Sequence, residues 1–194
     1  YQELIDFHIS KGNMNVLNML NTKYFIVRGQ NNQPIPQLNP NALGNAWFIS
    51  DIIRVKNSDE EIQKLGEINT ASQVVVDERY DIPSSIEYDS SATIQLTNYK
   101  ANHLIYESSS SKNQFGVFSE IYYNKGWNAY INGSLVPHIR VNYLLRGLPI
   151  PSGNHTIEFK FEPHTFYIAE NITLFSSILV IISLIYAIRQ EVIK

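Results

Sequence analysis

The sequence predicts a mainly β protein with a small α/β part, in which an antiparallel β-sandwich is followed by one C-terminal transmembrane helix. A long uncharged apolar run near the C-terminus predicts the helix. Short strand patterns separated by turn residues predict the sandwich, and alternating strand and helix patterns before them predict the α/β part. We expect a small α/β subdomain at 1–90, the sandwich at 91–163, the transmembrane helix at 166–188 and a cytoplasmic tail at 189–194.

Composition excludes several classes of protein. The 194 residues carry a formal net charge of −3, so the chain has no basic footprint for nucleic acid. It contains no cysteine, which excludes disulfides, thiolate metal sites and a cysteine nucleophile. The five histidines are scattered without metal-ligand spacing, at His8, His103, His138, His155 and His164. We therefore expect no metal site and no cofactor.

The first part of the chain alternates between helical and strand patterns. Val16, Leu17 and Leu20 share one face of an expected helix. The apolar residues 24–27 predict a short buried strand, and the Asn-, Gln- and Pro-rich segment 29–45 predicts a long loop.

A second strand is expected at 47–55, followed by a short helix. Ser58 and Glu61 have the spacing of a capping box, with Ser58 as the N-cap. The stripe of Ile62, Leu65 and Ile68 predicts the buried face of that helix, and the valines at 74–76 predict a third strand.

After Pro83 the pattern becomes purely that of strands. The strongest turn signal is Asn132-Gly133, which predicts a type I′ hairpin because both residues tolerate positive φ. From His155 to Phe161 apolar and polar residues alternate, as in a half-buried strand. Further strands are expected at 92–97, 104–108, 115–123 and 144–148. Predicted core residues of the sandwich are Phe118, Ile131, Phe159 and Phe161.

The run ITLFSSILVIISLIYAI, at residues 172–188, carries no charge. At ~1.5 Å per residue it spans most of a ~30 Å hydrocarbon core, so we expect a transmembrane helix rather than a buried core helix. Phe166 and Tyr167 stand where an interfacial aromatic belt belongs. Arg189 and Lys194 follow the run, which favours a cytoplasmic C-terminus and an extracytoplasmic domain, although Lys160 lies on the other flank.

One aromatic segment, FSEIYYNKGWNAY at residues 118–130, suggests a binding site. Glu120, Tyr122, Trp127 and Tyr130 are candidate glycan-binding residues, because ring faces stack on sugar C–H surfaces and a carboxylate accepts hydroxyl hydrogen bonds. The alternative, which we favour, is that Glu120 is structural and pairs with Arg140 or Arg146 in an aromatic core.

The strings FSEIYYNKGWNAYING and VNYLLRGLPIPSGNHTIEFKFEP, with NMLNTKYFIV and NPNALGNAWFI upstream, resemble the C-terminal region of the YfhO family of bacterial membrane proteins. That family is similar to polytopic GT-C-type glycosyltransferases, which use lipid-linked sugars outside the cytoplasmic membrane. The resemblance implies an upstream transmembrane bundle of the same protein, and as partners the lipid bilayer and a lipid-linked sugar or envelope glycan such as lipoteichoic acid. The catalytic acid of such enzymes lies in an early outer loop, so no catalytic residue is assigned to this chain.

Three functions remain open from the sequence. The chain is expected to be a non-catalytic extracytoplasmic domain that covers the membrane active site or holds the acceptor glycan. A non-enzymatic interaction or scaffolding module of the envelope is the alternative. A free-standing hydrolase needs a positioned acid/base pair, and the sequence offers none.

Overall fold

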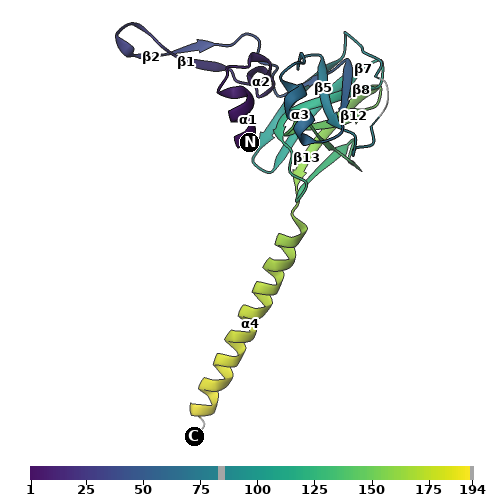
Figure 1. Cartoon of the computed structure of the whole chain (residues 1–194). Helices are drawn as coiled ribbons and strands as arrows, with labels where there is room; N and C mark the ends of the chain where they lie inside the picture. Colours follow the sequence, from purple (N-terminus) through teal and green to yellow (C-terminus); the bar gives the residue numbers. More distant parts are fainter. Residues whose placement is uncertain (83–85, 193–194) are drawn as a thin grey trace.

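The computed structural model describes residues 1–82 and 86–192, and it confirms the predicted fold class: antiparallel β-sheets followed by one long C-terminal helix (Figure 1). The strands are β1 (Tyr24–Arg28), β2 (Pro34–Leu38), β3 (Ala46–Phe48), β4 (Asp51–Val55), β5 (Gln73–Asp77), β6 (Thr93–Lys100), β7 (His103–Ser110), β8 (Gln114–Ile121), β9 (Trp127–Ile131), β10 (Ser134–Val136), β11 (Ile139–Val141), β12 (Leu145–Ile150) and β13 (Gly153–Phe161). The helices are α1 (Gln2–Leu4), the π-helix η1 (Ile5–Ile9), α2 (Met14–Met19), the 3₁₀ turn η2 (Gln30–Asn32), α3 (Ser58–Leu65) and α4 (His164–Val192).

Two antiparallel sheets form the sandwich. One has the strand order β10-β9-β13-β7-β6 and the other β11-β12-β8-β3. Their facing sides bury Tyr106, Phe118 and Phe159, whose rings meet edge to face, with 4.9 Å between the centroids of Phe118 and each of Phe159 and Tyr106. The predicted core residues Phe118, Ile131 and Phe159 are thus confirmed, while Phe161, at the end of β13, is half-buried.

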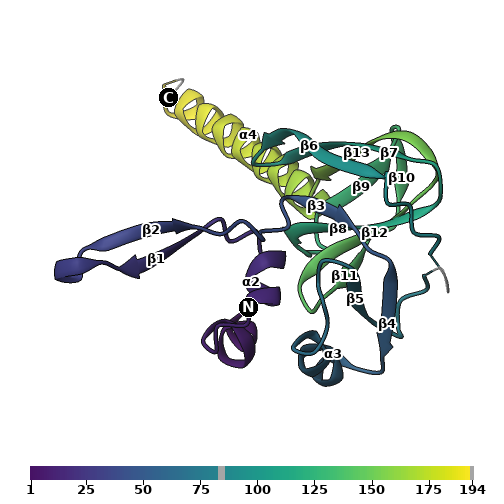
Figure 2. The same ribbon diagram turned by 90° about the horizontal axis from the view of Figure 1, so that it is seen from above.

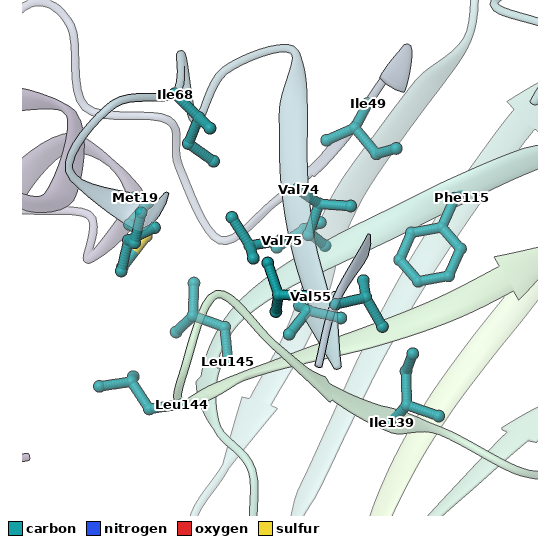
Figure 3. Close-up of a cluster of buried hydrophobic side chains, with 14 of the residues drawn as sticks. Met19, Ile49, Val55, Ile68, Val74, Val75, Phe115, Ile139, Leu144 and Leu145 are labelled. Carbon is teal, nitrogen blue, oxygen red and sulfur yellow. The ribbon is translucent and has the colours of Figure 1, made fainter. Parts of the chain in front are cut away.

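A third layer covers the outer side of the four-stranded sheet (Figure 2). It consists of the parallel pair β4-β5 with helices α3 and α2. Valines of β5 pack there against Phe115 and Leu145 (Figure 3). The Asn142 side chain accepts a hydrogen bond from Val75 N at 2.9 Å, which joins this layer to the β11-β12 turn. The four-stranded sheet is therefore buried on both faces.

The strand predicted at 47–55 is wrong as a single element. It is divided into β3, which pairs with β8 in the sandwich, and β4, which pairs with β5 in the third layer. The break falls at Ser50, whose amide donates to Ser72 O at 2.8 Å. The apolar pattern continues across the break because both strands are covered, so periodicity did not show where the chain changes sheets. The division into subdomains at residue 90 stays a prediction; β3, which comes before residue 90, pairs with β8 in the sandwich.

The buried strand at 24–27 and the long loop at 29–45 are also corrected. Strands β1 and β2 form a two-stranded hairpin that projects from the body (Figure 1). Ile26 is 70% exposed and Leu38 62% exposed. Along β2, every second residue directs its backbone N–H and C=O toward β1. Gln33 and Asn39 belong to that set, because their backbone groups bond Gly29 and Lys23. Pro34 and Pro36 belong to the alternate set, whose backbone groups point away from β1. The prolines therefore face the outer edge, where a missing N–H is tolerated.

The start of helix α3 lies one residue earlier than predicted. The N-cap is Asn57, whose side chain accepts from Glu60 N at 2.9 Å, and Glu60 accepts from Lys56 N at 3.0 Å. Asn is at least as good an N-cap as Ser, so the competing cap one residue upstream prevails. Glu61 therefore turns inward instead of capping, and the predicted stripe of Ile62, Leu65 and Ile68 is buried as expected.

Helix α4 leaves the body and contains Thr165–Gln190, 26 residues that are long and apolar enough to cross a membrane. None of this span is buried against protein, unlike the core helix weighed as the alternative. Ser176, Ser177 and Ser183 each donate to the carbonyl four residues earlier at 2.8 Å, so their hydroxyls need no water. The predicted tail begins within this helix at Arg189, and residues 193–194 lie outside the described part.

Candidate functional site

The structure separates the four candidate glycan residues. Strand β9 directs alternate side chains to opposite faces, so Trp127 turns toward the sandwich interior and Tyr130 lies on the outer face of the five-stranded sheet. The Tyr130 hydroxyl donates to Glu162 Oε2 at 2.7 Å, and the Lys160 ammonium lies 4.8 Å from its ring centroid. Tyr130 thus belongs to a surface network apart from the other three residues.

Tyr122 and Trp127 line an open groove of about 400 Å³. The groove lies between the loop after β8 and the hairpin β9-β10. Its polar lining comes from Asn124, Asn128 and His138, and its remaining lining from Ala129, Leu135, Val136 and Pro137. This volume falls within the range of ~300–1,000 Å³ usual for small-ligand sites. Two aromatic rings, the Asn124 amide and an imidazole thus line one concavity, while the Asn128 amide donates to Glu162 at 2.8 Å on the side of Tyr130.

Arg146 lies behind the groove, inside the sandwich, and is only 2% exposed. Its guanidinium carbon is 4.3 Å from the Trp127 ring centroid and 5.0 Å from that of Phe159. Its Nε donates to Ile121 O at 3.1 Å. Within the described part of the chain, Arg146 Nη1 and the nearby Tyr106 hydroxyl have no hydrogen-bond partner. Trp127 therefore contacts both the groove and a buried cation.

His138 forms one wall of the groove and packs edge-on against Tyr122, with 5.3 Å between the ring centroids. Burial, together with the positive charge of Arg146, lowers the pKa of His138 to about 4. At neutral pH the imidazole is therefore uncharged, with one nitrogen that donates and one that accepts. Its Nε2 is buried behind the groove wall and has no hydrogen-bond partner among the described residues.

Glu120 is half-buried and does not line the groove. The expected pair with Arg140 does not form, because Arg140 donates to the buried Glu61 at 2.7 Å and to Ser58 at 3.0 Å. Among the residues that the structure describes, no ion pair to the Glu120 carboxylate is present. Burial raises the pKa of Glu120, and the charge of Arg146 opposes that rise. Arg146 is thus the cation whose charge acts on the Glu120 carboxylate.

Sequence reasoning missed His138 and the two asparagines of the groove, and it named Arg146 only as a possible partner of Glu120. The asparagines stand beside Trp127 in the segment YYNKGWN, so their amides were a readable signal. His138 precedes β11 and Arg146 lies in β12, and only the pairing of β12 with β8 brings Arg146 behind Trp127. No group of three or more potential metal ligands occurs in the residues described.

A second cavity, of about 260 Å³, lies at the opposite end of β8. It is lined mainly by apolar side chains, including Phe115, Ile150 and Pro151, with the amides of Asn113 and Gln114. It contains none of the predicted site residues.

Comparison with protein families decides the identity of this part of the chain. Residues 81–173, just under half of the chain, match the family model of the bacterial membrane protein YfhO. The segment is a YfhO region. It contains β6 to β13 and the first third of α4, so every side chain of the groove and of the Arg146 cluster lies within the YfhO region. Neither a curated protein nor a solved structure matches the chain.

Proposed function

We propose that this YfhO region is the extracytoplasmic part of a polytopic membrane protein of the lipid-linked-sugar glycosyltransferase type, where it holds a saccharide of the acceptor envelope glycan. The observation that carries the proposal is the groove of Tyr122, Trp127, Asn124, Asn128 and His138. The bilayer is a partner through α4, which is long and apolar enough to span it.

The lining chemistry fits a neutral sugar. Tyr122 and Trp127 present large, rigid apolar faces with a polar edge, which suits the C–H face of a pyranose ring. The Asn124 amide offers donors and an acceptor, whereas the Asn128 amide already donates to Glu162 at 2.8 Å. Hydroxyl groups of a sugar can satisfy such mixed partners, whereas a phosphate would require exposed cations. Two of the four residues predicted from the sequence, Tyr122 and Trp127, are retained as ligand contacts. The other two, Glu120 and Tyr130, do not line the groove.

The orientation of the chain belongs to this proposal. Arg189 lies in the last turn of α4, directly after the uncharged run 172–188, and Lys194 is the last residue of the chain. Positive residues next to a membrane span favour the cytoplasmic side. The sandwich at the other end of α4 would then lie outside the cytoplasmic membrane, where envelope glycans are found.

We further propose that the region supplies no catalytic group. The groove has two titratable side chains: Tyr122, whose pKa is raised by burial, and His138, whose Nε2 has no partner in the described part of the chain. Among the residues that the structure describes, no carboxylate lines the groove beside them. General acid–base catalysis needs a pair of groups positioned on the substrate. The acid of the transferase would come from the upstream transmembrane bundle.

The test is saccharide binding by the full chain in nanodiscs, titrated with purified envelope glycans, lipoteichoic acid included. Asn124→Ala and Tyr122→Ala remove groove contacts and should weaken binding. Tyr130→Ala is the matched control, because Tyr130 lies on the outer sheet face. Binding that is absent from the unaltered chain, or lost equally in the control, would refute the proposal.

A scaffolding role is the second candidate, and the hairpin β1-β2 favours it. Its large apolar side chains are exposed on both faces, with Tyr24 58%, Ile26 70% and Ile35 49% exposed. Such a surface marks an interaction site. Replacing Ile26 and Ile35 with Ser should disrupt assembly of the full-length protein while saccharide binding persists; under the glycan-holding proposal alone, assembly would be unchanged.

A further inference from the structure

Two turns flank the point where α4 leaves the sandwich. Strand β13 lies between β7 and β9, and its last residue Phe161 pairs with Trp127 on one side and donates its N–H to Asn102 O at 2.9 Å on the other. The next amide, of Glu162, donates to Gly126 O at 2.6 Å. The turn 99–102 and the loop 122–126 are therefore both fixed to the connector. We call them the membrane-end turns.

The packing at this junction is tight. Gly126 has φ 131°, and a Cβ placed there would lie 2.7 Å from Phe161 and 3.2 Å from Pro163. Only two residues, Glu162 and Pro163, separate the end of β13 from the start of α4. At ~3.5 Å per residue, the connector holds the sandwich within about 10 Å of the helix.

The height of the membrane-end turns above the hydrocarbon core of the bilayer follows from the length of the helix. A bilayer core takes ~20 helical residues, so a span that ends at Ile188 has its outer boundary near Ala169, with Glu170 at that boundary. Helical residues 164–168 then rise ~7 Å through the headgroup layer. The sandwich end lies directly above them, so the membrane-end turns reach the outer headgroups.

The side chains of these turns suit that level. Tyr99 is 65% exposed and Tyr123 is 50% exposed. Lys100 and Lys125 are also exposed, and in the described part of the chain neither ammonium has an ion-pair partner. In the loop, Tyr122 and Asn124 line the groove while Tyr123 and Lys125 do not. Exposed tyrosines and lysines are the residue types that contact phospholipid headgroups.

Two acids near the end of β13, Glu158 and Glu162, have partners of their own. The Glu162 carboxylate accepts from Tyr130 at 2.7 Å and from Asn128 at 2.8 Å. Glu158 lies within 2.7 Å of His103 and 3.0 Å of Lys160. Lys100 and Lys125 are thus the charged groups at the tips of the membrane-end turns, and neither has an ion-pair partner in the described part of the chain.

We propose that the membrane-end turns form a docking surface for the anionic phospholipid headgroups of the bilayer that α4 spans. Lys100 and Lys125 contact phosphates, and Tyr99 and Tyr123 lie between the headgroups. Docking at three points, the helix and both turns, holds the sandwich upright with one end against the membrane. The inference rests on α4 as a membrane anchor and is independent of saccharide binding, which the groove variants test separately.

The absence of cysteine from the chain makes a single-site probe straightforward. Ala101→Cys, at the tip of one turn, carries a nitroxide in the full chain reconstituted into nanodiscs. A lipid with a nickel-chelating headgroup broadens the nitroxide spectrum when the label touches the headgroup layer. Nanodiscs of phosphatidylcholine with phosphatidylglycerol are compared with discs of phosphatidylcholine alone, each at low and high salt.

We expect strong broadening in the anionic discs, and its loss in neutral discs and at high salt. Each lysine should contribute about a fivefold change in the ratio of docked to undocked states. The double variant Lys100→Ala/Lys125→Ala should therefore release the domain, and charge reversal to Glu should release it further. Lys112→Ala, in the turn at the opposite end of β7, is the control and should leave the broadening unchanged. Equal broadening in both disc types, or in the double variant, overturns the proposal.

Discussion

The buried guanidinium of Arg146 lies among aromatic rings, and its positive charge stabilises the charged form of the Glu120 carboxylate. Replacing Glu120 with Gln removes the negative charge that offsets this cation. We expect the free energy of unfolding to fall by about 1–3 kcal/mol, because a buried charge loses its compensation. Saccharide affinity should be unaffected, since Glu120 does not line the groove. Chemical denaturation and glycan titration of the same variant check both points; an unchanged free energy of unfolding with lost affinity would make Glu120 a ligand.

His138 should make stability depend on pH. Its pKa is lowered in the folded state to about 4, while the unfolded chain has the ordinary value of 6.5. Between these values the unfolded state binds more protons, so stability rises with pH through this window and is lost as the pH falls from about 6.5 to about 4. His138→Gln removes this contribution. Unfolding curves across the window should show a smaller pH dependence in the variant, and an identical slope in both proteins would contradict the buried, neutral imidazole.

At the level of elements, the hairpin β9-β10 depends on its two turn residues. Asn132 has φ 51° and Gly133 has φ 79°, as the type I′ prediction requires. A Cβ at Gly133 would meet nothing within 4 Å, so Gly133→Ala introduces backbone strain without a steric clash. We expect a loss of about 1–2 kcal/mol of stability. Ser134→Ala, one residue later, serves as the control; equal stability of the Gly133 variant and wild type would argue against this turn.

The elements best predicted from sequence were those whose signal is local. The Asn132-Gly133 turn, the alternation along β13 and the uncharged run of α4 each depend on neighbouring residues only, and each is present. The apolar residues of β1 did not distinguish a buried strand from an exposed hairpin, because both favour β-branched and aromatic residues. Pro34 and Pro36 argued against β2, although they lie on its free edge.

The site was only partly readable for a related reason. Tyr122 and Trp127 are close in sequence and share the groove, so local pattern predicted them together. Tyr130 was grouped with them by proximity along the chain, but strand alternation places it on the other face. His138 and Arg146 reach the same region through the pairing of the strands that follow the hairpin, β12 with β8 above all, which no local pattern indicates.

At the level of the whole molecule, a β-sandwich with a third layer is joined through two residues to a helix that can cross a membrane (Figure 1). The groove lies between the loop after β8 and the β9-β10 hairpin, and the loop is bonded to the connector through Gly126. The fold thus keeps the candidate saccharide site close to the bilayer. This arrangement is useful to a glycosyltransferase only if the sandwich lies on the outer side.

Cysteine accessibility in cells that make the full-length protein tests this claim most directly. Ser111→Cys, on the exposed turn after β7, and a cysteine appended directly after Lys194 are each introduced into the full-length protein, in which any cysteine outside the present chain is replaced by Ser. The cells are treated with a membrane-impermeant maleimide. The account predicts that the Ser111→Cys variant is labelled in intact cells, and that the variant with the appended cysteine is labelled only after the membrane is permeabilised. Labelling of the appended cysteine in intact cells, with the Ser111→Cys variant protected, would contradict it.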